Sequence, residues 1–320
     1  MSKAIMVAAS VVVIGLLLYF GAVRTFSGRS ASDGASQTRS SLAAQSTADT
    51  APAEVGTATS PTPAAVQAAP SAPVVAQPPA PAPVSVTAEL DRAQALINDA
   101  NFYDARRILT TLILAVSEGP EREKVRTMLD EANSHLFFSP EPSPDCAVYT
   151  VGKGDSLWTI MQKTHVSIAL IKQINRRPSD AIREGESLKI PQGGFSIIVD
   201  RGHFRLMVFF NGQYIKEYPV GIGKSGLTPG GEFEIEQLVV DPQWTDPQGK
   251  VHAARAPDNQ LGSRWMGFKA TATRNGLGIH GTIDPASIGT VCSNGCVRLN
   301  NQDAEEVYSL MRKGDKVMIW

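Results

Sequence analysis

Large side chains are distributed so unevenly along this chain of 320 residues that only part of it can form a core. Before about residue 88 the sequence consists mostly of Ala, Pro, Ser and Thr, whereas almost every aromatic residue lies after residue 100. A segment of the first kind buries too little apolar surface to offset the conformational entropy lost on folding. We therefore expect a folded part of about 230 residues, which is long enough for more than one domain.

The charge balance and the cysteine pattern limit the classes of function. Lys and Arg total 30 and Asp and Glu total 31, so the net charge is -1. Proteins that bind nucleic acids usually show a strongly basic face, and we expect no nucleic-acid partner. The 3 cysteines contain no C-x-x-C pair and are too few for a disulfide-dense scaffold.

Residues 1–26 contain an uncharged apolar run, residues 4–23, which Lys3 precedes. A helix of about 20 apolar residues spans the ~30 Å hydrocarbon layer of a membrane, and the run lacks a clean small-x-small cleavage site. We expect an uncleaved single-pass membrane anchor, with a cleaved secretory signal as the alternative. In both cases the remainder would be exported to the cell envelope, outside the cytoplasm.

Two segments of different character follow. Pro, Ala and Val recur within residues 27–87. This segment is expected to form a partly extended tether. Residues 88–138 repeat apolar side chains at i, i+3, i+4 and i+7, which predicts helices. Part of this pattern resembles a tetratricopeptide-type hairpin, but it falls short of the three or so repeats that a solenoid needs. We expect a helical spacer and leave a protein partner open.

A compact signature occupies residues 147–192. A short strand, a turn in which Asp155 or Ser156 caps a helix, a second helix ending near Asn175 and a final strand are expected. The opening and closing motifs are Tyr149-Thr150-Val151-x-x-Gly154-Asp155-Ser156-Leu157-Trp158-x-Ile160 and Ile182-x-x-Gly185-x-x-Leu188-x-Ile190-Pro191. This strand–helix–helix–strand unit resembles a LysM module.

The resemblance implies binding to glycans that contain N-acetylglucosamine, such as peptidoglycan. The groove of the family would lie between the loop after the first strand and residues 177–182. The glycan-binding candidates on the first loop are Gly154, Asp155, Ser156 and Leu157. Four apolar residues are instead expected in the core of the module: Trp158, Ile160, Leu170 and Leu188.

From residue 195 to residue 320 the pattern changes to short apolar runs with period two. Strands are expected at residues 196–200, 204–210, 214–220, 232–240 and 316–320. Asn211-Gly212 is a hairpin-turn signal, and residues 303–312 form the one clear helix, with Asp303 as a helix-start residue rather than a catalytic one. A domain made mostly of strands implies a sandwich or a barrel.

Chemically capable residues concentrate between residues 278 and 299. Cys296 lies after Gly295 and two residues before Arg298, and a small neighbour and a nearby cation both favour formation of a thiolate. His280 is 16 residues upstream. Two strands joined by a loop of that size can bring imidazole and sulfur within hydrogen-bond distance, as activation of a nucleophile requires.

The wider motif is more specific than this pair. It reads His280-Gly281-Thr282, Pro285-Ala286-Ser287-Ile288-Gly289 and Ser293-x-Gly295-Cys296-x-Arg298-x-x-Asn301-x-Asp303, with Thr228-Pro229-x-Gly231-x-Phe233 upstream. This pattern resembles the signature of the L,D-transpeptidases, also called the YkuD family. The resemblance implies a mainly β catalytic domain, sandwich-like or barrel-like, over residues 195–320. The expected chain thus combines a membrane helix, a helical hairpin spacer, a βααβ LysM module and this domain.

The resemblance also implies roles for individual residues. Cys296 would be the nucleophile, and His280 the general base that later protonates the leaving amine. The backbone N–H groups of Gly295 and Cys296 would form an oxyanion hole. Arg298 would shape the site and favour anionic groups, and Ser293 would brace the loop and help position the imidazole. Asn294 stands where many members carry a second His and could donate a hydrogen bond. No metal or cofactor is implied.

The implied reaction is acyl transfer on a peptidoglycan tetrapeptide stem. The thiolate would attack the carbonyl of the third residue, D-alanine would leave, and an amine would take the acyl group to give a 3→3 cross-link or an attached protein or D-amino acid. Hydrolysis of the same thioester would make the enzyme an L,D-carboxypeptidase. A non-catalytic wall-binding protein is the third alternative.

Other enzyme classes fit less well. In NlpC/P60 peptidases Cys precedes His, which is the reverse of the order here, and no Ser has the Lys three residues on that a D,D-transpeptidase needs. His203, His252 and His280 lack the close spacing of a zinc site. A Cys146–Cys292 disulfide, a Cys292–Cys296 disulfide and three reduced thiols all remain open. Trp265 is assigned equally to a cleft or to the core.

Overall fold

The computed structural model describes residues 85–271 and 275–320, all within one compact unit. The expected membrane anchor at residues 1–26 and nearly all of the expected tether lie outside these residues. In the part of the chain that the structure describes, no helix is both long enough and apolar enough to span a bilayer.

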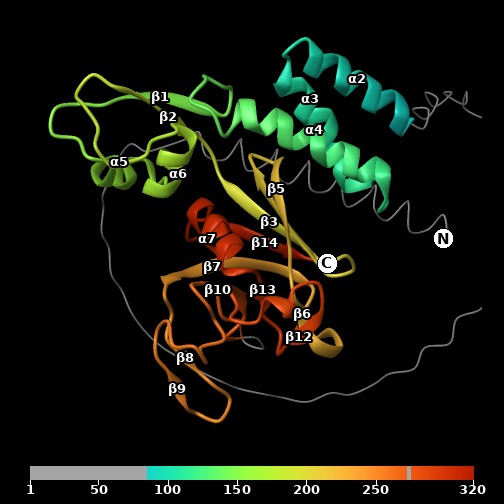
Figure 1. The fold of residues 1–320 in the computed structure, drawn as a ribbon, viewed down its shortest axis with the longest axis vertical. Helices are drawn as coiled ribbons and strands as arrows, with labels where there is room; N and C mark the ends of the chain where they lie inside the picture. The colour runs from blue at the N-terminus through green and yellow to red at the C-terminus, as the bar shows by residue number, and fades with distance from the viewer. Residues whose placement is uncertain (1–84, 272–274) are drawn as a thin grey trace, which may run out of the picture. The chain divides into compact units, whose positions relative to one another are not determined.

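The described chain begins with three helices, α2 (Val86–Asn98), α3 (Phe102–Ala115) and α4 (Pro120–Leu136), shown in Figure 1. Asn101 caps α3, because its side chain accepts the backbone N–H of Asp104. Gly119, with φ of 143°, and Pro120 as the first helical residue start α4. Gly supplies the positive φ, and Pro sits where its missing N–H leaves no helical bond unmade.

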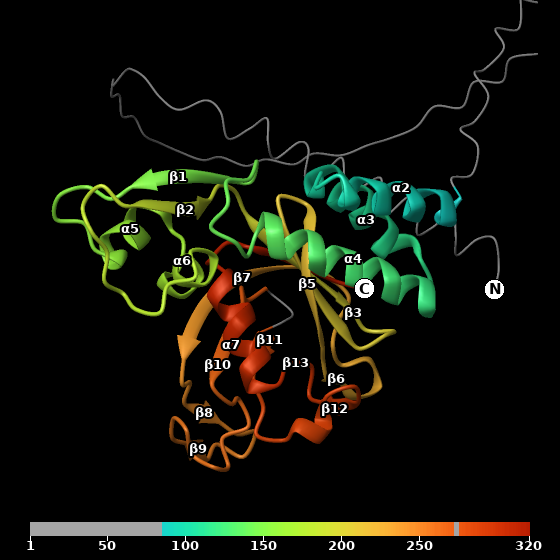
Figure 2. The ribbon, with the colours of Figure 1, turned by 45° about the horizontal axis from the view of Figure 1, so that its top comes forward.

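The apolar faces of these helices are covered by strands of the C-terminal domain, residues 195–320. Ile198, Met207, Phe209 and Tyr214 from three strands belong to the same hydrophobic cluster as the buried side chains of α2, α3 and α4. Figure 2 shows these helices beside β3 (Phe195–Asp200) and β5 (Gln213–Pro219). The helices therefore share a hydrophobic core with the sheet, in addition to the covalent connection through the chain.

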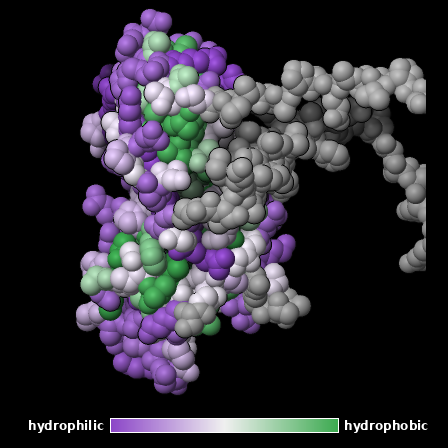
Figure 3. Space-filling model, turned by 90° about the vertical axis from the view of Figure 1, so that its right-hand side faces the viewer, coloured by the Kyte–Doolittle hydropathy of each residue, from purple (hydrophilic) through white to green (hydrophobic). Residues whose placement is uncertain are grey.

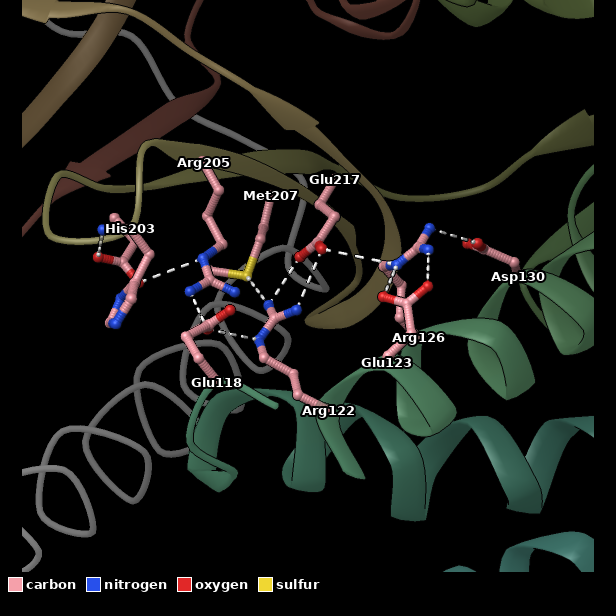
Figure 4. A network of polar contacts seen from close by, with 10 residues as sticks. Glu118, Arg122, Glu123, Arg126, Asp130, His203, Arg205, Met207 and Glu217 are labelled. Atoms are coloured by element: carbon pink, nitrogen blue, oxygen red, sulfur yellow. Dashed lines mark hydrogen bonds and ion pairs between the residues drawn. The ribbon is translucent and has the colours of Figure 1, made fainter. Parts of the chain in front are cut away.

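Polar side chains continue this contact at its edge. Arg122 of α4 donates to both carboxylate oxygens of Glu217 at 3.0 and 2.7 Å, and also pairs with Glu118. Arg205 pairs with Glu118 as well, so that one glutamate joins two arginines (Figure 4). Because Arg122 is buried, the paired carboxylates replace the water that its guanidinium loses.

The LysM module contains β1 (Cys146–Thr150), α5 (Leu157–Thr164), α6 (Ile168–Ile174) and β2 (Ser187–Pro191), with β1 and β2 antiparallel. Ser156 caps α5 in a capping box with Thr159. Asn175 ends α6 and exchanges hydrogen bonds with the backbone of Lys189 in β2. The two halves of the motif are thus joined by the Asn between them.

One core expectation in this module is wrong. Ile160, Leu170 and Leu188 are buried, but the side chain of Trp158 is 60% exposed. The neighbouring Leu157 fills the core instead. Successive helical residues point about 100° apart, so Leu157 and Trp158 cannot both face inward at the first turn of so short a helix.

Buried polar side chains connect the LysM module to the helices. Lys189 donates from its buried ammonium to the carbonyl oxygens of Leu136 and Ser139, at 2.6 and 3.0 Å, beyond the end of α4. Arg106, fully buried in α3, pairs with Asp145 just before β1. Both contacts satisfy groups that burial would otherwise leave unpaired.

The C-terminal domain is built on an eight-stranded sheet with the order β13-β11-β10-β7-β14-β3-β4-β5. Only β14–β3 and β11–β13 are parallel among its pairs. A helix, α7, packs against β10 and β11. The remaining elements are β3 (Phe195–Asp200), β4 (Arg205–Phe210), β5 (Gln213–Pro219), β6 (Ile222–Gly223), β7 (Gly231–Val240), β8 (Trp244–Thr245), β9 (Val251–His252), β10 (Arg264–Phe268), β11 (Gly278–His280), β12 (Val291–Ser293), β13 (Val297–Arg298), α7 (Asn301–Leu310) and β14 (Lys316–Ile319), with 3-10 turns at Lys224–Gly226 and Pro285–Ser287.

The sheet curls so that its two ends meet. Gly221, two residues after the edge strand β5, forms a two-hydrogen-bond bridge with Arg298 of the opposite edge strand β13, at 2.9 and 2.8 Å. The domain is therefore mainly β and barrel-like. The face seen in Figure 3 is mostly hydrophilic, with apolar side chains gathered in separate patches.

Candidate active site

His280 ends β11, and Cys296 directly precedes β13, the parallel neighbour of β11. In the register of β11 and β13, Ile279 pairs with Val297 and His280 pairs with Arg298, so Cys296 lies opposite Gly278. Side chains two residues apart on a strand share a face, so this register, continued by one residue beyond β13, puts the thiol and the imidazole on the same side. Neither side chain is hydrogen-bonded to the other, and the Cys296 Sγ contacts the carbonyl oxygen of Gly276 at 3.6 Å. In unliganded sites such catalytic contacts are often longer than in complexes with substrate.

The turn before the thiol is held in one conformation. Gly295 has φ of 130°, and a Cβ there would come within 2.9 Å of a Leu277 methyl and 3.0 Å of the Leu227 carbonyl oxygen. Ser293 donates to the carbonyl oxygen of Cys296 at 2.6 Å and accepts the N–H of Gly295 at 3.1 Å. Ser293 thus braces this loop, but it makes no hydrogen bond to the described imidazole of His280.

Sequence reasoning missed the role of Thr228 in this turn. Its hydroxyl donates to the carbonyl oxygen of Gly295 at 2.9 Å and accepts the N–H of Gly223 at 2.6 Å, and the residue is buried. The signal was present in the Thr228-Pro229-x-Gly231 motif, which the sequence identified as a family turn without a partner for the hydroxyl.

Only one of the two expected oxyanion donors is available. The N–H of Gly295 is occupied by Ser293, whereas the N–H of Cys296 makes no hydrogen bond with any residue that the structure describes. The turn uses the N–H of Gly295 to fix itself, and the oxyanion role of this group stays a prediction.

The ring of His280 is oriented by the backbone and by an indole. Its Nδ1 lies 2.5 Å from the carbonyl oxygen of Gly281, which assigns the proton to Nδ1 and leaves Nε2 as the acceptor. Trp265, directly opposite His280 on β10, packs on the ring with centroids 5.9 Å apart. A neutral imidazole held in this way is suited to accept a proton at Nε2.

Burial controls the protonation of both groups. Desolvation lowers the pKa of His280 to about 4, and the nearby Arg298 adds to this direction. Desolvation also raises the pKa of the Cys296 thiol, more than the Gly278 N–H and Arg298 lower it. Burial of the anion therefore opposes the thiolate that we expected from the sequence, whereas the half-buried cation of Arg298 favours it.

Arg298 and Asn294 flank the site differently. Arg298 donates to Gln260 at 3.0 Å, and its Nε is buried without a hydrogen-bond partner in the described chain. Asn294 is exposed at the tip of the loop. The cation therefore lies beside the reacting groups, and the amide faces solvent.

A cavity of about 390 Å³ opens onto the sulfur of Cys296. Trp265 lines it, so this residue belongs to the cleft as well as to the packing around His280. The other described lining residues are Gln237, Val239, Pro242, Gln243, Trp244, Thr245, Leu261 and Gly276.

The chain is similar in sequence to known proteins over the same region. A family model of the L,D-transpeptidase catalytic domain (YkuD) matches residues 194–319, and a LysM model matches residues 149–191. The Bacillus subtilis protein YkuD, whose name assigns it to the L,D-transpeptidases, is 31% identical over 178 residues, which are 53% of this chain and 97% of that protein. The chain belongs to the YkuD family of L,D-transpeptidases.

Two further L,D-transpeptidases are similar to this chain to different degrees. Bacillus subtilis YqjB is 34% identical over 125 residues, or 38% of this chain and 69% of that protein. The catalytic domain of an E. faecium L,D-transpeptidase has 21% identity and a TM-score of 0.32, covering 40% of this chain and 98% of that domain.

The LysM loop of this family member places its four candidate residues in different environments. Gly154 and Ser156 are exposed, and Leu157 is only 2% exposed. The Asp155 carboxylate accepts from Tyr149 and from the Gly152 N–H and pairs with Lys163, and these contacts keep its pKa well below the usual range. The side chains of Asp155 and Leu157 thus form the loop, Gly154 presents its backbone to solvent, and the exposed Ser156 uses its hydroxyl to cap α5.

All three cysteines carry free thiols in this structure. Cys292 contacts the Ser287 carbonyl oxygen at 3.4 Å, and Cys146 lies at the start of β1. In residues 85–271 and 275–320, no cluster of three or more His, Cys, Asp or Glu side chains is arranged to hold a metal ion.

Proposed function

We propose that this YkuD-family chain is a peptidoglycan L,D-transpeptidase with Cys296 as its nucleophile and His280 as its general base. The observation that supports the proposal is the register of β11 and β13, in which His280 pairs with Arg298 and Cys296 directly precedes β13. A cavity reaches the sulfur from outside, so that a peptide carbonyl can approach it.

The proposed first step starts from two neutral groups. Sγ attacks the carbonyl carbon of the third residue of a tetrapeptide stem while Nε2 of His280 takes the thiol proton, so that no free thiolate has to be buried. The oxyanion is stabilised by the N–H of Cys296. The bond to D-alanine then breaks, the imidazolium gives its proton to the departing amine, and a thioester remains. Removing a donor to such an oxyanion typically costs about 10²–10³ in rate.

The second proposed step reverses the first with another amine. The side-chain amine of a second stem attacks the thioester carbonyl, and His280 accepts its proton. The carbon–sulfur bond breaks, and the sulfur regains a proton from His280. The product is a 3→3 cross-link, and the enzyme returns to its starting state without a cofactor.

The same proposal gives the remaining segments their roles. The LysM module would bind glycan strands and so raise the concentration of stems near Cys296. Residues 1–26 would anchor the chain in the cytoplasmic membrane, with the LysM module and the catalytic domain in the envelope outside the cytoplasm. A protein partner of the helices is not needed for either role.

The reaction can be tested with the full chain and isolated peptidoglycan that carries tetrapeptide stems. We expect mass spectrometry to detect 3→3 cross-linked muropeptides and one released D-alanine for each link. Cys296→Ala should abolish both products, whereas Cys292→Ala serves as a matched control and should retain them. D-alanine release without cross-links, even with added amine, would establish the carboxypeptidase. Wall binding with neither product would leave only the non-catalytic alternative.

A further inference from the structure

One wall of the Cys296 cavity is a small hairpin between β7 and β10. Its strands are β8 and β9, in which Trp244 pairs directly with His252. Pro242, Gln243, Trp244 and Thr245 from this segment all line the cavity. The position of the hairpin therefore determines the shape of the space in front of the sulfur.

His252 is buried beneath the indole ring of Trp244. Its side chain is only 7% exposed, and the two rings pack with centroids 4.7 Å apart and planes tilted by 30°. A buried imidazole on the solvent-facing arm of a hairpin needs polar partners. It finds them in two carboxylates of the same segment.

The two carboxylates lie on opposite nitrogens of the ring. Nε2 is 3.1 Å from Asp246, and Nδ1 is 2.9 Å from Asp258, the second without the alignment of a hydrogen bond. Asp246 also accepts the N–H groups of Gln248 and Lys250, and the Lys250 ammonium pairs with Asp258. The imidazole therefore connects the turn of the hairpin to the segment that returns toward β10.

A buried amide fixes the base of the same hairpin. Asn259 donates to the carbonyl oxygens of Pro242 and Ala253 and accepts the N–H of Leu261, at 2.8 to 3.0 Å. The base and the turn are thus both tied down. The His252 ring packs against the indole that faces the cavity, so it links the fixed hairpin to the position of Trp244.

The residues that line the cavity indicate what kind of ligand Trp244 would contact. None of the described residues that line the cavity carries a charge, and two of them are tryptophans. An indole face gives a large apolar contact at a small cost in conformational entropy. The cavity therefore fits an uncharged, partly aliphatic stretch of peptide next to the attacked carbonyl, with the charged groups of the stem outside it.

We propose that Trp244 is a binding residue for the peptide stem, and that His252 is the positioning residue that holds the indole in the cavity wall. This inference rests on the proposed function for the identity of the ligand, but the positioning of Trp244 by His252 does not depend on turnover. Because the contact acts on binding, loss of His252 should raise KM and leave kcat nearly unchanged.

The test uses the full chain, labelled with 5-fluorotryptophan, and a tetrapeptide stem as ligand. His252→Phe keeps a ring but removes both nitrogens, and it should shift or broaden the Trp244 resonance, which Trp244→Phe assigns. KM should rise about tenfold, the range that one apolar contact provides, with kcat within about twofold. Asp258→Asn, at a more exposed position, should move both readouts in the same direction by a smaller amount.

A double-mutant cycle makes the assignment specific. Trp244→Ala should raise KM at least as much as His252→Phe, and the double variant should be no worse than Trp244→Ala, because His252 acts through the indole. His203→Phe is the matched control, since His203 also pairs with an aspartate, Asp200, but lies away from the cavity. It should change neither the resonance nor KM.

The outcomes separate this inference from the proposed function. If the wild-type chain does not turn over, binding of the tetrapeptide to Cys296→Ala, measured by calorimetry, replaces KM. The positioning proposal is overturned by an unchanged Trp244 resonance in His252→Phe, by effects of the two substitutions that multiply, or by a loss confined to kcat. Absence of any tetrapeptide binding to the cavity would overturn it as well.

Discussion

Thr228 donates a hydrogen bond to the carbonyl oxygen of Gly295, the residue directly before the thiol, across 2.9 Å. The same hydroxyl accepts the N–H of Gly223 at 2.6 Å. A single buried side chain therefore connects the turn before β7, the strand β6 and the loop that carries Cys296. The geometry of the nucleophile depends on a residue 67 or more positions away in sequence.

Thr228→Val tests this connection while nearly preserving shape. The substitution leaves two buried backbone groups unpaired, at roughly 1–3 kcal/mol for each such group. We expect kcat to fall by about tenfold, since small displacements of a reacting group are costly. Thr290→Val, which removes an exposed hydroxyl bonded to the Ser287 carbonyl oxygen at 2.9 Å, is the control and should be active. Equal kcat in the two variants would contradict the prediction.

The backbone at Gly295 provides a second prediction. Gly295→Ala combines a strained φ of 130° with a Cβ that meets the Leu227 carbonyl and a Leu277 methyl. We expect at least a hundredfold loss of activity, because the loop must shift. Gly289→Ala also has a positive φ, of 78°, but has open space around its Cβ, so it should lose stability of about 1 kcal/mol and retain activity. Similar activity losses in both variants would rule out the steric explanation.

His280 gives a pH prediction with a definite sign. Its pKa falls from the ordinary 6.5 to about 4 in the folded chain. The imidazole is thus neutral and able to act as base above about pH 4, and kcat/KM should decline only below that pH. Between pH 6.5 and 4 the unfolded chain binds more protons than the folded one, so the free energy of unfolding should decrease as the pH falls. The contribution is roughly 3 kcal/mol.

His280→Gln is the matching variant for stability. It has no group to titrate, so denaturant unfolding between pH 6.5 and 4 should show a smaller decrease than in the wild type. A steeper or unchanged decrease would mean that other groups account for the pH dependence. Activity of this variant is expected to be lost at every pH.

Asp315 should change the free energy of unfolding with pH in the opposite direction to His280. Burial raises the pKa of its carboxyl from 3.8 to about 6, although the side chain accepts the Arg312 N–H at 2.7 Å. The folded chain then binds more protons than the unfolded one between these values, so this group lowers stability as the pH rises. Asp315→Asn should stabilise the protein at pH 7.5 by about 1–2 kcal/mol, or several degrees in Tm, and much less at pH 4. Asp180→Asn, an exposed control, should be nearly neutral.

The contact between the helices and the sheet predicts that both unfold together as one cooperative unit. Asn133 of α4 is 1% exposed and donates to the carbonyl oxygens of Tyr214 and Ile215 in β5, at 2.9 and 3.1 Å. Asn133→Ala should destabilise the catalytic domain by about 2–3 kcal/mol, since it leaves buried acceptors unpaired. Asn98→Ala at an exposed helix end should have little effect. Separate unfolding transitions for helices and sheet would contradict this prediction.

The contact between the helices and the sheet also limits which residues can be deleted from the chain. A fragment of residues 145–320 would uncover Ile198, Met207, Phe209 and Tyr214, which the helices bury. We expect such a fragment to aggregate, because a contiguous apolar sheet face would be exposed. A soluble, active fragment measured by light scattering and turnover would show that the helices are dispensable.

The elements that the sequence revealed are those with local signals. Ser156 and its capping box and the Asn211-Gly212 turn follow from spacing and residue type alone. The position of Trp158 did not follow, because periodicity in a helix of 8 residues leaves the inward face undefined at its first turn.

What the sequence could not provide depends on contacts between distant segments. Burial in the folded chain raises the pKa of the Cys296 thiol, and no local pattern encodes this burial. The apolar faces of the helices have their partners in β3, β4 and β5, about 80 residues further along. Thr228 likewise needed its acceptor, Gly295, to be placed before its role could be recognised.

The pairing of β11 with β13 has a consequence for how this fold tolerates change. The residues between His280 and β12 can gain or lose length without moving either group, provided that the two strands keep their alignment and Ser293 keeps its contacts with the turn before Cys296. A slip by one residue would turn the sulfur to the opposite side of the sheet, since neighbouring side chains alternate. Insertions are therefore compatible with catalysis in the connecting loop, and a single inserted or deleted residue within either strand is not.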